Sequence, residues 1–157
     1  MAKATPTDAV KVLARNKKAR HEYHVDETLE AGIVMVGSEV KSIRDGKVVL
    51  RDAYARVEDG EVWLYAMHVS PFPFARHELD PERRRKLLLN RREIVELTQA
   101  TQVQGVSLIP LKLYFKDRRV KLELGVGRGK KSYDKRQAIA ERDAKRETDR
   151  ALKESRR

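Results

Sequence analysis

Residues 106–126 read VSLIPLKLYFKDRRVKLELGV, two mainly apolar segments separated by four polar residues. Residues 106–115 and 120–126 both have strand character, because leucine, β-branched and aromatic side chains dominate them. The polar residues 116–119 lie between the two segments and are typical of a turn. The stretch therefore predicts two consecutive strands joined by a short connection.

The residues upstream predict further short strands. Residues 21–36 alternate between polar and apolar side chains and then become continuously apolar, which indicates one long strand or two. Residues 48–57 and 62–67 flank the pair Asp59-Gly60, and an Asp-Gly pair between alternating residues is a strong hairpin signal. Together these patterns predict about six short strands.

Two segments of the body predict helices. Residues 39–44 are long enough for one or two helical turns, and Gly46 follows them as a stop. Residues 90–104 begin at Asn90, an N-cap residue with Glu93 three positions later, and end before Gly105. The fold class predicted is mainly β: a closed or nearly closed antiparallel barrel with two to three short helices. An open α+β sheet with its helices on one face is the alternative.

Positive charge is concentrated at the two ends of the 157-residue chain, whose formal net charge is +11. Residues 1–20 hold six basic residues and one acidic residue, and residues 129–157 hold eleven basic and six acidic residues. The residues between them are nearly neutral. We therefore expect a flexible basic arm at 1–15, a barrel domain at 16–128 and a basic tail at 129–157. This distribution favours a polyanionic partner, nucleic acid before an acidic membrane, over the alternative of solubilising tails.

The tail contains few apolar side chains, chiefly Ile139 and Leu152. Without a face to bury, an isolated helix of this kind does not offset the entropy of its own ordering. We therefore expect residues 129–157 to be disordered in the free protein and to form a helix on a negatively charged partner.

Several classes of function are disfavoured by composition. The chain has no cysteine, which excludes disulfides and thiol chemistry, and its four histidines do not form a ligand set. Neither a signal peptide nor a run of about 18 apolar residues is present. We expect a cytoplasmic monomer with no membrane association, no cofactor, no metal and no enzymatic activity.

Two runs of cations are candidate phosphate-binding sites. Residues 83–86 (RRRK) precede three leucines and the predicted helix at Asn90. Cations beside a helix start favour phosphate, and the leucines are expected to be mostly core. Residues 16–21 (NKKARH) form a similar but weaker signal. The glycines of residues 125–130 do not have P-loop spacing and are interpreted as a flexible exit from the barrel.

Six blocks of the sequence, in order, resemble the small protein B family, the tmRNA-binding proteins of bacterial trans-translation. The blocks are 16–23 (NKKARHEY), 29–33 (LEAGI), 37–42 (GSEVKS), 84–89 (RRKLLL), 110–115 (PLKLYF) and 129–136 (GKKSYDKR). The resemblance covers about residues 16–146 and implies an oligonucleotide-binding-type (OB-fold-like) barrel that holds the tRNA-like domain of tmRNA.

The resemblance also implies which residues contact RNA. Positions matching Asn16, Glu30 and Leu88 belong to the RNA-contacting surface of the family, and an acidic group such as Glu30 would accept hydrogen bonds from base or sugar donors. Combined with the cationic runs, the residues expected to bind tmRNA are Asn16, Lys17, Lys18, Arg20, His21, Glu30, Arg84, Arg85, Lys86 and Leu88.

In this family the tail enters the decoding centre and the empty mRNA channel of the ribosome as a helix. The resemblance implies that Tyr133 stacks on a base there and that cations of the tail neutralise ribosomal RNA phosphates. The expected ribosome-binding residues are Lys130, Lys131, Tyr133, Asp134, Lys135, Arg136, Arg142, Lys145 and Arg146. Charged tmRNA would also connect the protein indirectly to alanyl-tRNA synthetase and elongation factor Tu.

Two other functions are weighed against a tmRNA adaptor. A ribosomal protein or a general barrel-type RNA chaperone would bind many RNAs and associate constitutively with ribosomes. An RNA-processing enzyme is disfavoured because no cluster of carboxylates or histidines is evident in the sequence.

Overall fold

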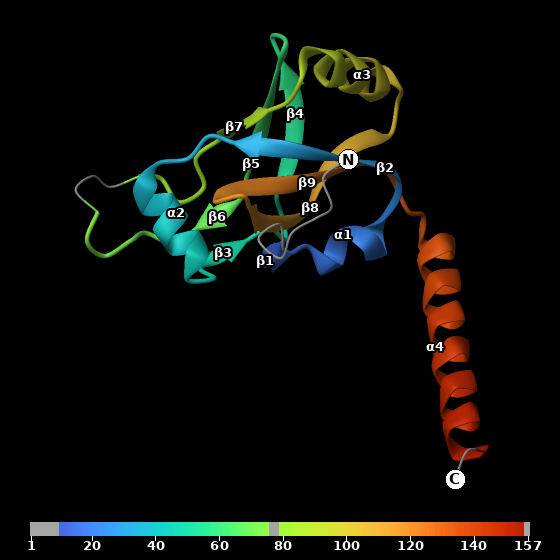
Figure 1. The fold of residues 1–157 in the computed structure, drawn as a ribbon. Helices are drawn as coiled ribbons and strands as arrows, with labels where there is room; N and C mark the ends of the chain where they lie inside the picture. The colour runs from blue at the N-terminus through green and yellow to red at the C-terminus, as the bar shows by residue number, and fades with distance from the viewer. Residues whose placement is uncertain (1–9, 76–78, 156–157) are drawn as a thin grey trace, which may run out of the picture.

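Six antiparallel strands close into a barrel in the computed structural model, which describes residues 10–75 and 79–155. The side chains of residues 132–134 are outside this description. Around the barrel, β8 (Val106–Lys116) pairs with β4 (Tyr54–Glu58), which pairs with β5 (Glu61–Tyr65). The ring continues through β7 (Arg85–Leu88), β2 (Tyr23–Ile33) and β9 (Arg119–Gly129), and β9 pairs back onto β8. The predicted OB-like barrel of about six strands is confirmed (Figure 1).

Two tight hairpin turns set the register of four of these strands. Asp59 and Gly60 connect β4 to β5 with φ angles of 49° and 75°, the left-handed pair that a type I′ turn requires. Asp117 and Arg118 connect β8 to β9 with φ angles of 50° and 62°. The polar turn predicted at 116–119 is therefore a second hairpin of the same kind.

The core fills the barrel with the inward side chains of every strand. Leu64, Leu113, Leu122 and Leu124 have no measurable exposure, and Leu87 is 1 % exposed. Along β9 and β5 these buried positions alternate with outward-facing ones, as the period of a strand requires. Burial of these side chains, at roughly 25 cal/mol per Å² of apolar surface, is the main favourable term in folding the barrel.

Two helices and a small sheet cover the ends of the barrel. Helix α2 (Gly37–Arg44) and the two-stranded sheet of β3 (Val48–Val49) and β6 (His68–Val69) lie together at one side. Helix α3 (Arg91–Gln102) lies at another side, where its Leu97 is 1 % exposed and joins the main core. The Asn90 amide donates to Glu93 Oε1 over 3.1 Å, as the predicted capping pattern requires.

A second, smaller core lies outside the barrel, beneath helix α1 (Lys17–Glu22). Ala19 of this helix packs against Ile109 and Leu111 of β8, and Tyr23 and Val25 of β2 complete the cluster. This helix was not predicted from sequence, which extended strand character from residue 21. The helix attaches a cationic segment to the outer surface of β8 and β2.

The barrel domain and its flanks differ from the sequence-based expectation in three places. Residues 11–15, expected to be part of a flexible arm, form β1 (Lys11–Arg15), which pairs with β8. Residues 1–9 lie outside the described part of the chain. Residues 85–88, expected as a cation run before a helix, form β7 between β5 and β2. Residues 125–129, expected as a flexible exit, belong to β9.

Position 127 of β9 requires a glycine because β2 lies very close to it. A Cβ atom on this residue would lie 2.2 Å from the carbonyl oxygen of His24, so the two strands could not approach as they do. A β-bulge lies at the same place, between Val25 and Glu27 of β2. Gly127 therefore permits the close packing of β2 and β9 at this position.

Helix α4 (Ser132–Ser155) follows β9 and extends away from the barrel (Figure 1). From residue 141 to residue 155 every side chain of the helix is exposed. The structure thus shows the tail in the helical form that was predicted for its bound state, and its disorder in the free protein stays a prediction. None of the helices in the described part of the chain is long and apolar enough to cross a membrane.

Candidate nucleic-acid interface

Asn16 begins the candidate interface, but its side chain lies inside the protein and is only 5 % exposed. Its Oδ1 accepts from the amide of Ala19 over 3.1 Å and caps α1. Its Nδ2 donates to Pro110 O over 2.9 Å and to Leu50 O over 3.3 Å. The side-chain amide is occupied by these contacts, so Asn16 holds α1 against β8 instead of offering a free group to RNA.

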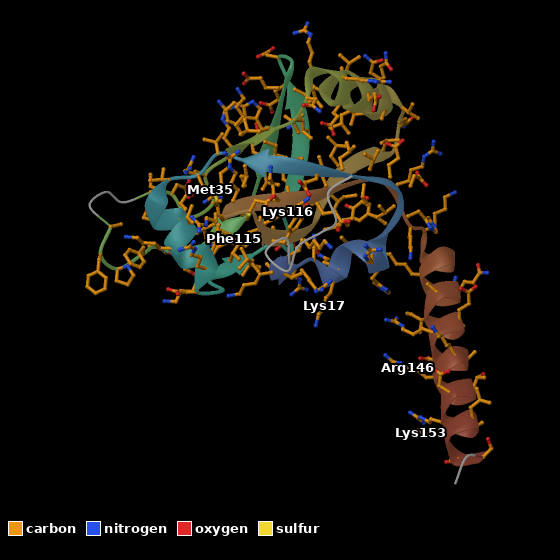
Figure 2. All side chains as sticks on the ribbon, viewed as in Figure 1. Lys17, Met35, Phe115, Lys116, Arg146 and Lys153 are labelled. Atoms are coloured by element: carbon orange, nitrogen blue, oxygen red, sulfur yellow. The ribbon has the colours of Figure 1, made fainter. Side chains whose placement is uncertain are left out.

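Helix α1 presents cations to solvent at the edge of the barrel. Lys17, Arg20 and His21 are exposed, and Lys17 points away from the barrel in Figure 2. Lys18 lies near two carboxylates, Glu22 at 3.8 Å and Asp52 at 3.6 Å. The side chains predicted for RNA binding in residues 17–21 therefore share one helix, and Lys17, Arg20 and His21 are exposed on it.

Glu30 lies on the outer surface of β2, β9 and β8, called the β2–β9–β8 face below. Its Oε2 accepts from the Tyr114 hydroxyl over 2.5 Å and from Lys116 Nζ over 3.3 Å. The Tyr114 hydrogen bond is the main reason that the pKa of Glu30 is lowered, with Lys116 adding to the effect and burial opposing it. Burial and the Glu30 carboxylate raise the pKa of Tyr114. Glu30 is thus an ionised, positioned acceptor on a face that also carries lysines.

Leu88 lies on the same face as Glu30. It pairs with Gly32, two residues from Glu30 on β2, and its Cβ would be 3.2 Å from a Cβ on that glycine. With 52 % of its surface exposed, Leu88 is not a core residue, although the three leucines after the cation run 83–86 were expected to be mostly core. It borders a hollow of about 410 Å³ that Met35, Phe115, Arg118, Arg119 and Lys121 also line. Figure 2 shows Met35 and Phe115 on this side of the barrel.

The cation run 83–86 is divided between the interior and the surface. Arg85 is 1 % exposed, and it donates through Nε and Nη2 to Glu39 Oε2 over 2.8 and 2.5 Å. Its Nη1 donates to Met67 O over 2.8 Å. Since β7 is a strand, Arg85 and Leu87 point inward while Lys86 and Leu88 point outward. The guanidinium of Arg85 is thus enclosed and paired in this structure, which disfavours the phosphate contact predicted for it, and that contact stays a prediction.

Arg84 and Lys86 lie on a different outer surface, beside β5. The Arg84 guanidinium is 4.2 Å from the centre of the Trp63 ring and 3.4 Å from Glu58 Oε2. Lys86 Nζ is 2.9 Å from Glu61 Oε1. These residues stay predicted RNA contacts, but each is already paired with a carboxylate, and neither is on the β2–β9–β8 face.

The root of the tail is attached to α1. The Lys130 amide donates to Glu22 O over 2.6 Å, and Lys130 Nζ donates to Arg20 O over 3.0 Å. An ammonium group at the last carbonyls of a helix is favourable because it complements the helix dipole. Lys130 was predicted as a ribosome contact, and in this structure it connects the tail to the cationic helix.

Helix α4 carries a row of cations along one face. Lys135, Arg142, Arg146 and Lys153 are spaced by seven, four and seven residues, which aligns them at 3.6 residues per turn. Figure 2 shows Arg146 and Lys153 on the same side of the helix. At 3.6 residues per turn, Arg136 and Lys145 project from other sides of the helix. Lys131 precedes the helix, and Tyr133 and Asp134 lie in its first turn.

The structure brings together some of the predicted residues and adds others. Lys17, Lys18, Arg20 and His21 lie at one end of the β2–β9–β8 face, and Glu30 and Leu88 lie further along it. Tyr114 and Lys116 of this face were missed. Lys112 and Tyr114 occur at period two in a predicted strand, which would have placed them on one face, and β8 extends one residue beyond that prediction to include Lys116. Within residues 10–75 and 79–155, no group of three His, Cys, Asp or Glu side chains could hold a metal ion.

Comparison with known proteins gives consistent matches. The family described as "SmpB protein" matches residues 13–154. Two relatives called "SsrA-binding protein" cover almost the full chain. The protein of Desulfitobacterium hafniense is 56 % identical over 149 residues, which are 94 % of this chain and 96 % of the relative. The protein of Chloroflexus aggregans is 54 % identical over 154 residues, which are 96 % of each chain.

A solved structure agrees with the sequence matches. It is described as "tmRNA-SmpB: a journey to the center of the bacterial ribosome", and a chain in it superimposes with a TM-score of 0.65. The two chains are 42 % identical, and the match covers 80 % of this chain and 93 % of the other.

Proposed function

Because this chain belongs to the SmpB protein family, we propose that it binds the tRNA-like domain of tmRNA and delivers it to stalled ribosomes. The observation that carries the proposal is the match to SsrA-binding proteins at 56 % identity across 94 % of the chain. The protein is an adaptor in this proposal, acting by binding and not by catalysis.

The barrel domain supplies the tmRNA-binding surface in this proposal. Lys17 and Arg20 neutralise phosphates from α1, His21 lies exposed beside them, and Glu30 accepts hydrogen bonds from base or ribose donors. The Tyr114 hydroxyl and Lys116 ammonium support the geometry of that acceptor, since both donate to its Oε2. Leu88 offers an exposed apolar contact beside it. Asn16 acts through the position of α1.

The tail supplies a second surface for the decoding centre and empty mRNA channel. Its 24-residue helix is about 36 Å long at ~1.5 Å per residue. Lys135, Arg142 and Arg146 form the row that would follow ribosomal RNA phosphates, and Tyr133 would stack on a base. Alanyl-tRNA synthetase and elongation factor Tu are indirect partners through charged tmRNA.

The test compares RNAs under one salt condition. Binding of the full chain to a tmRNA tRNA-like domain and to an unrelated RNA duplex of equal length is measured by fluorescence anisotropy at ~0.15 M salt, where exposed charges are screened beyond about 8 Å. We expect at least a tenfold preference for the tRNA-like domain, about 1.4 kcal/mol. Equal affinity for both RNAs would instead support a general RNA chaperone.

A further inference from the structure

A groove of about 660 Å³ lies between α1 and β4, next to the proposed RNA-binding helix. Its walls include Lys18, Glu22, Tyr23, Arg51, Tyr54 and Arg56. This volume lies in the range of roughly 300–1,000 Å³ that small-molecule sites occupy. The groove is thus large enough for a nucleotide, and both charged groups and aromatic rings line it.

The groove exists because two neighbouring strands of the barrel separate. β4 and β8 pair at a single position, Ala55 opposite Leu108. Further along β8, its partner is β1 at residues 112–115, and Asn16 bonds to the carbonyls of Pro110 and Leu111. The seam between β4 and β8 is therefore the least tightly paired part of the ring, and α1 forms the other wall of the opening.

Tyr54 provides a stacking surface in this groove. Its ring packs on Tyr65 with the ring centres 5.4 Å apart and the planes 12° from parallel. An aromatic ring has two faces, and Tyr54 remains 45 % exposed and lines the groove. A base could therefore continue the stack of Tyr65 and Tyr54 on the face that Tyr65 leaves uncovered.

The cations of the groove differ in whether a carboxylate of the protein already pairs with them. Lys18 is shared between Glu22 and Asp52, at 3.8 and 3.6 Å. Arg51 and Arg56 are exposed, and neither forms an ion pair with a carboxylate in the part of the chain that the structure describes. Two unneutralised guanidinium groups beside an aromatic platform have the chemistry of a single-strand nucleic-acid site, in which bases stack and phosphates meet arginine.

We propose that this groove takes one unpaired nucleotide of the bound RNA, with its base on Tyr54 and its phosphate at Arg51 and Arg56. The inference rests on the proposed function, because it specifies how the same RNA continues from α1 into the barrel seam. A base in a duplex has its faces covered by its neighbours, so the ligand must be a nucleotide in a loop or other unstacked segment.

The test measures binding of the tRNA-like domain to the full-length protein and four variants. Tyr54→Ala removes the platform, and Tyr54→Phe keeps the ring. Arg56→Gln removes one cation of the groove, and Arg92→Gln removes an exposed cation of α3 as the matched control. Loss of one base stack predicts between about 5-fold and 150-fold weaker binding for Tyr54→Ala, with little change for Tyr54→Phe.

Salt dependence separates phosphate contact from stacking. Arg56→Gln should reduce the slope of log K against log salt by about 0.7, the value for one phosphate contact in a single strand. Arg92→Gln should leave the slope unchanged. In parallel, 2-aminopurine is placed singly at each unpaired position of the RNA. One position should show quenched fluorescence with the wild-type protein and recovery with Tyr54→Ala.

The outcomes distinguish this inference from the proposed function. If the wild-type protein binds the tRNA-like domain selectively but Tyr54→Ala and Arg56→Gln bind it equally well, the groove is not a nucleotide site and the function stands. If the wild-type protein shows no selectivity, both proposals fail. Thermal unfolding of each variant is recorded. If Tyr54→Ala is unfolded, the affinity and the salt slope of Arg56→Gln test the nucleotide site by themselves.

Discussion

Arg85 of β7 donates through Nε and Nη2 to Oε2 of Glu39 on α2, at 2.8 and 2.5 Å. Both residues are at most 5 % exposed. Arg83 also donates to Glu39, and the Val36 amide donates to its Oε1 over 3.0 Å. This ion pair connects α2 to the barrel, and it removes one cation from the surface on which sequence alone had placed it.

Breaking the Arg85–Glu39 pair should destabilise the fold. Arg85→Met removes one of the two guanidinium partners of the buried Glu39 carboxylate and leaves Arg83 as the other, and breaking a buried pair costs up to about 3–5 kcal/mol. The free energy of unfolding, measured by urea denaturation, should fall by that amount. Lys86→Met is the matched control, because Lys86 and Glu61 form an exposed pair worth about 0–1 kcal/mol. Similar losses in the two variants would contradict the assignment of Arg85 to the core.

The same pair predicts acid sensitivity. Burial opposes ionisation of Glu39, but hydrogen bonds from Arg83, the Val36 amide and Arg85 outweigh it and lower the pKa of Glu39 below 4.5. Since the folded-state pKa is depressed, the stabilisation is fully present above pH 4.5 and is lost as the pH falls through the folded-state pKa. In Glu39→Gln this component of the pH dependence should disappear. If the difference in free energy of unfolding between the wild type and Glu39→Gln is constant from pH 7 to pH 3, Glu39 does not cause the acid sensitivity.

Gly127→Ala should destabilise the barrel by at least about 1–3 kcal/mol, since the new Cβ would overlap the His24 carbonyl oxygen. Gly129→Ala is the control, because nothing lies within 4 Å of a Cβ at that position of the same strand. A surface substitution of this kind usually changes stability by less than about 0.5 kcal/mol. Denaturant midpoints of the two variants provide the measurement. Equal midpoints would mean that β2 and β9 do not approach as closely as they do here.

Glu30→Gln should change the affinity for RNA. The direction of that change identifies the role of Glu30. If Glu30 accepts hydrogen bonds from RNA, neutralising it should weaken binding by about 1.5–3 kcal/mol, the value for a hydrogen bond to a charged group. If Glu30 is only a solvated surface residue, removing a negative charge near phosphates should strengthen binding. We expect weakening, measured by anisotropy with the tRNA-like domain. Glu96→Gln on α3 is the control, and its affinity should be unchanged.

Removal of the tail should separate the two proposed surfaces. A chain ending at Lys131 keeps the contacts of Lys130 to Arg20 and Glu22 and therefore keeps the cap on α1. We expect it to bind the tRNA-like domain within about threefold of the full chain, roughly 0.6 kcal/mol, and to lose tagging on stalled ribosomes in a reconstituted translation assay. If tmRNA binding is lost as well, the two surfaces are wrongly assigned.

The sequence predicted the features that depend on neighbouring residues. Asp59-Gly60 specified a type I′ turn because glycine adopts positive φ readily, and residues 90–105 carried their own helix start and stop signals. Leucine, β-branched and aromatic side chains in residues 106–126 predicted strands, because such side chains pack well on a pleated surface. It did not predict α1 or β7, which are short and are stabilised by Ile109, Val62 and other residues distant in the chain.

The family, the strand and turn pattern, and the concentration of cations at the two ends of the chain were predictable from the order of the residues. What each cation faces depends on the folded arrangement of the strands and helices. Arg84, Arg85 and Lys86 are adjacent in sequence, but strand geometry and the position of Glu39 send Arg85 into the core and the other two to the surface. Asn16 is buried because β8 supplies carbonyl partners from 94 residues away. The reason is that burial depends on contacts made across the fold, which no local pattern of residues encodes.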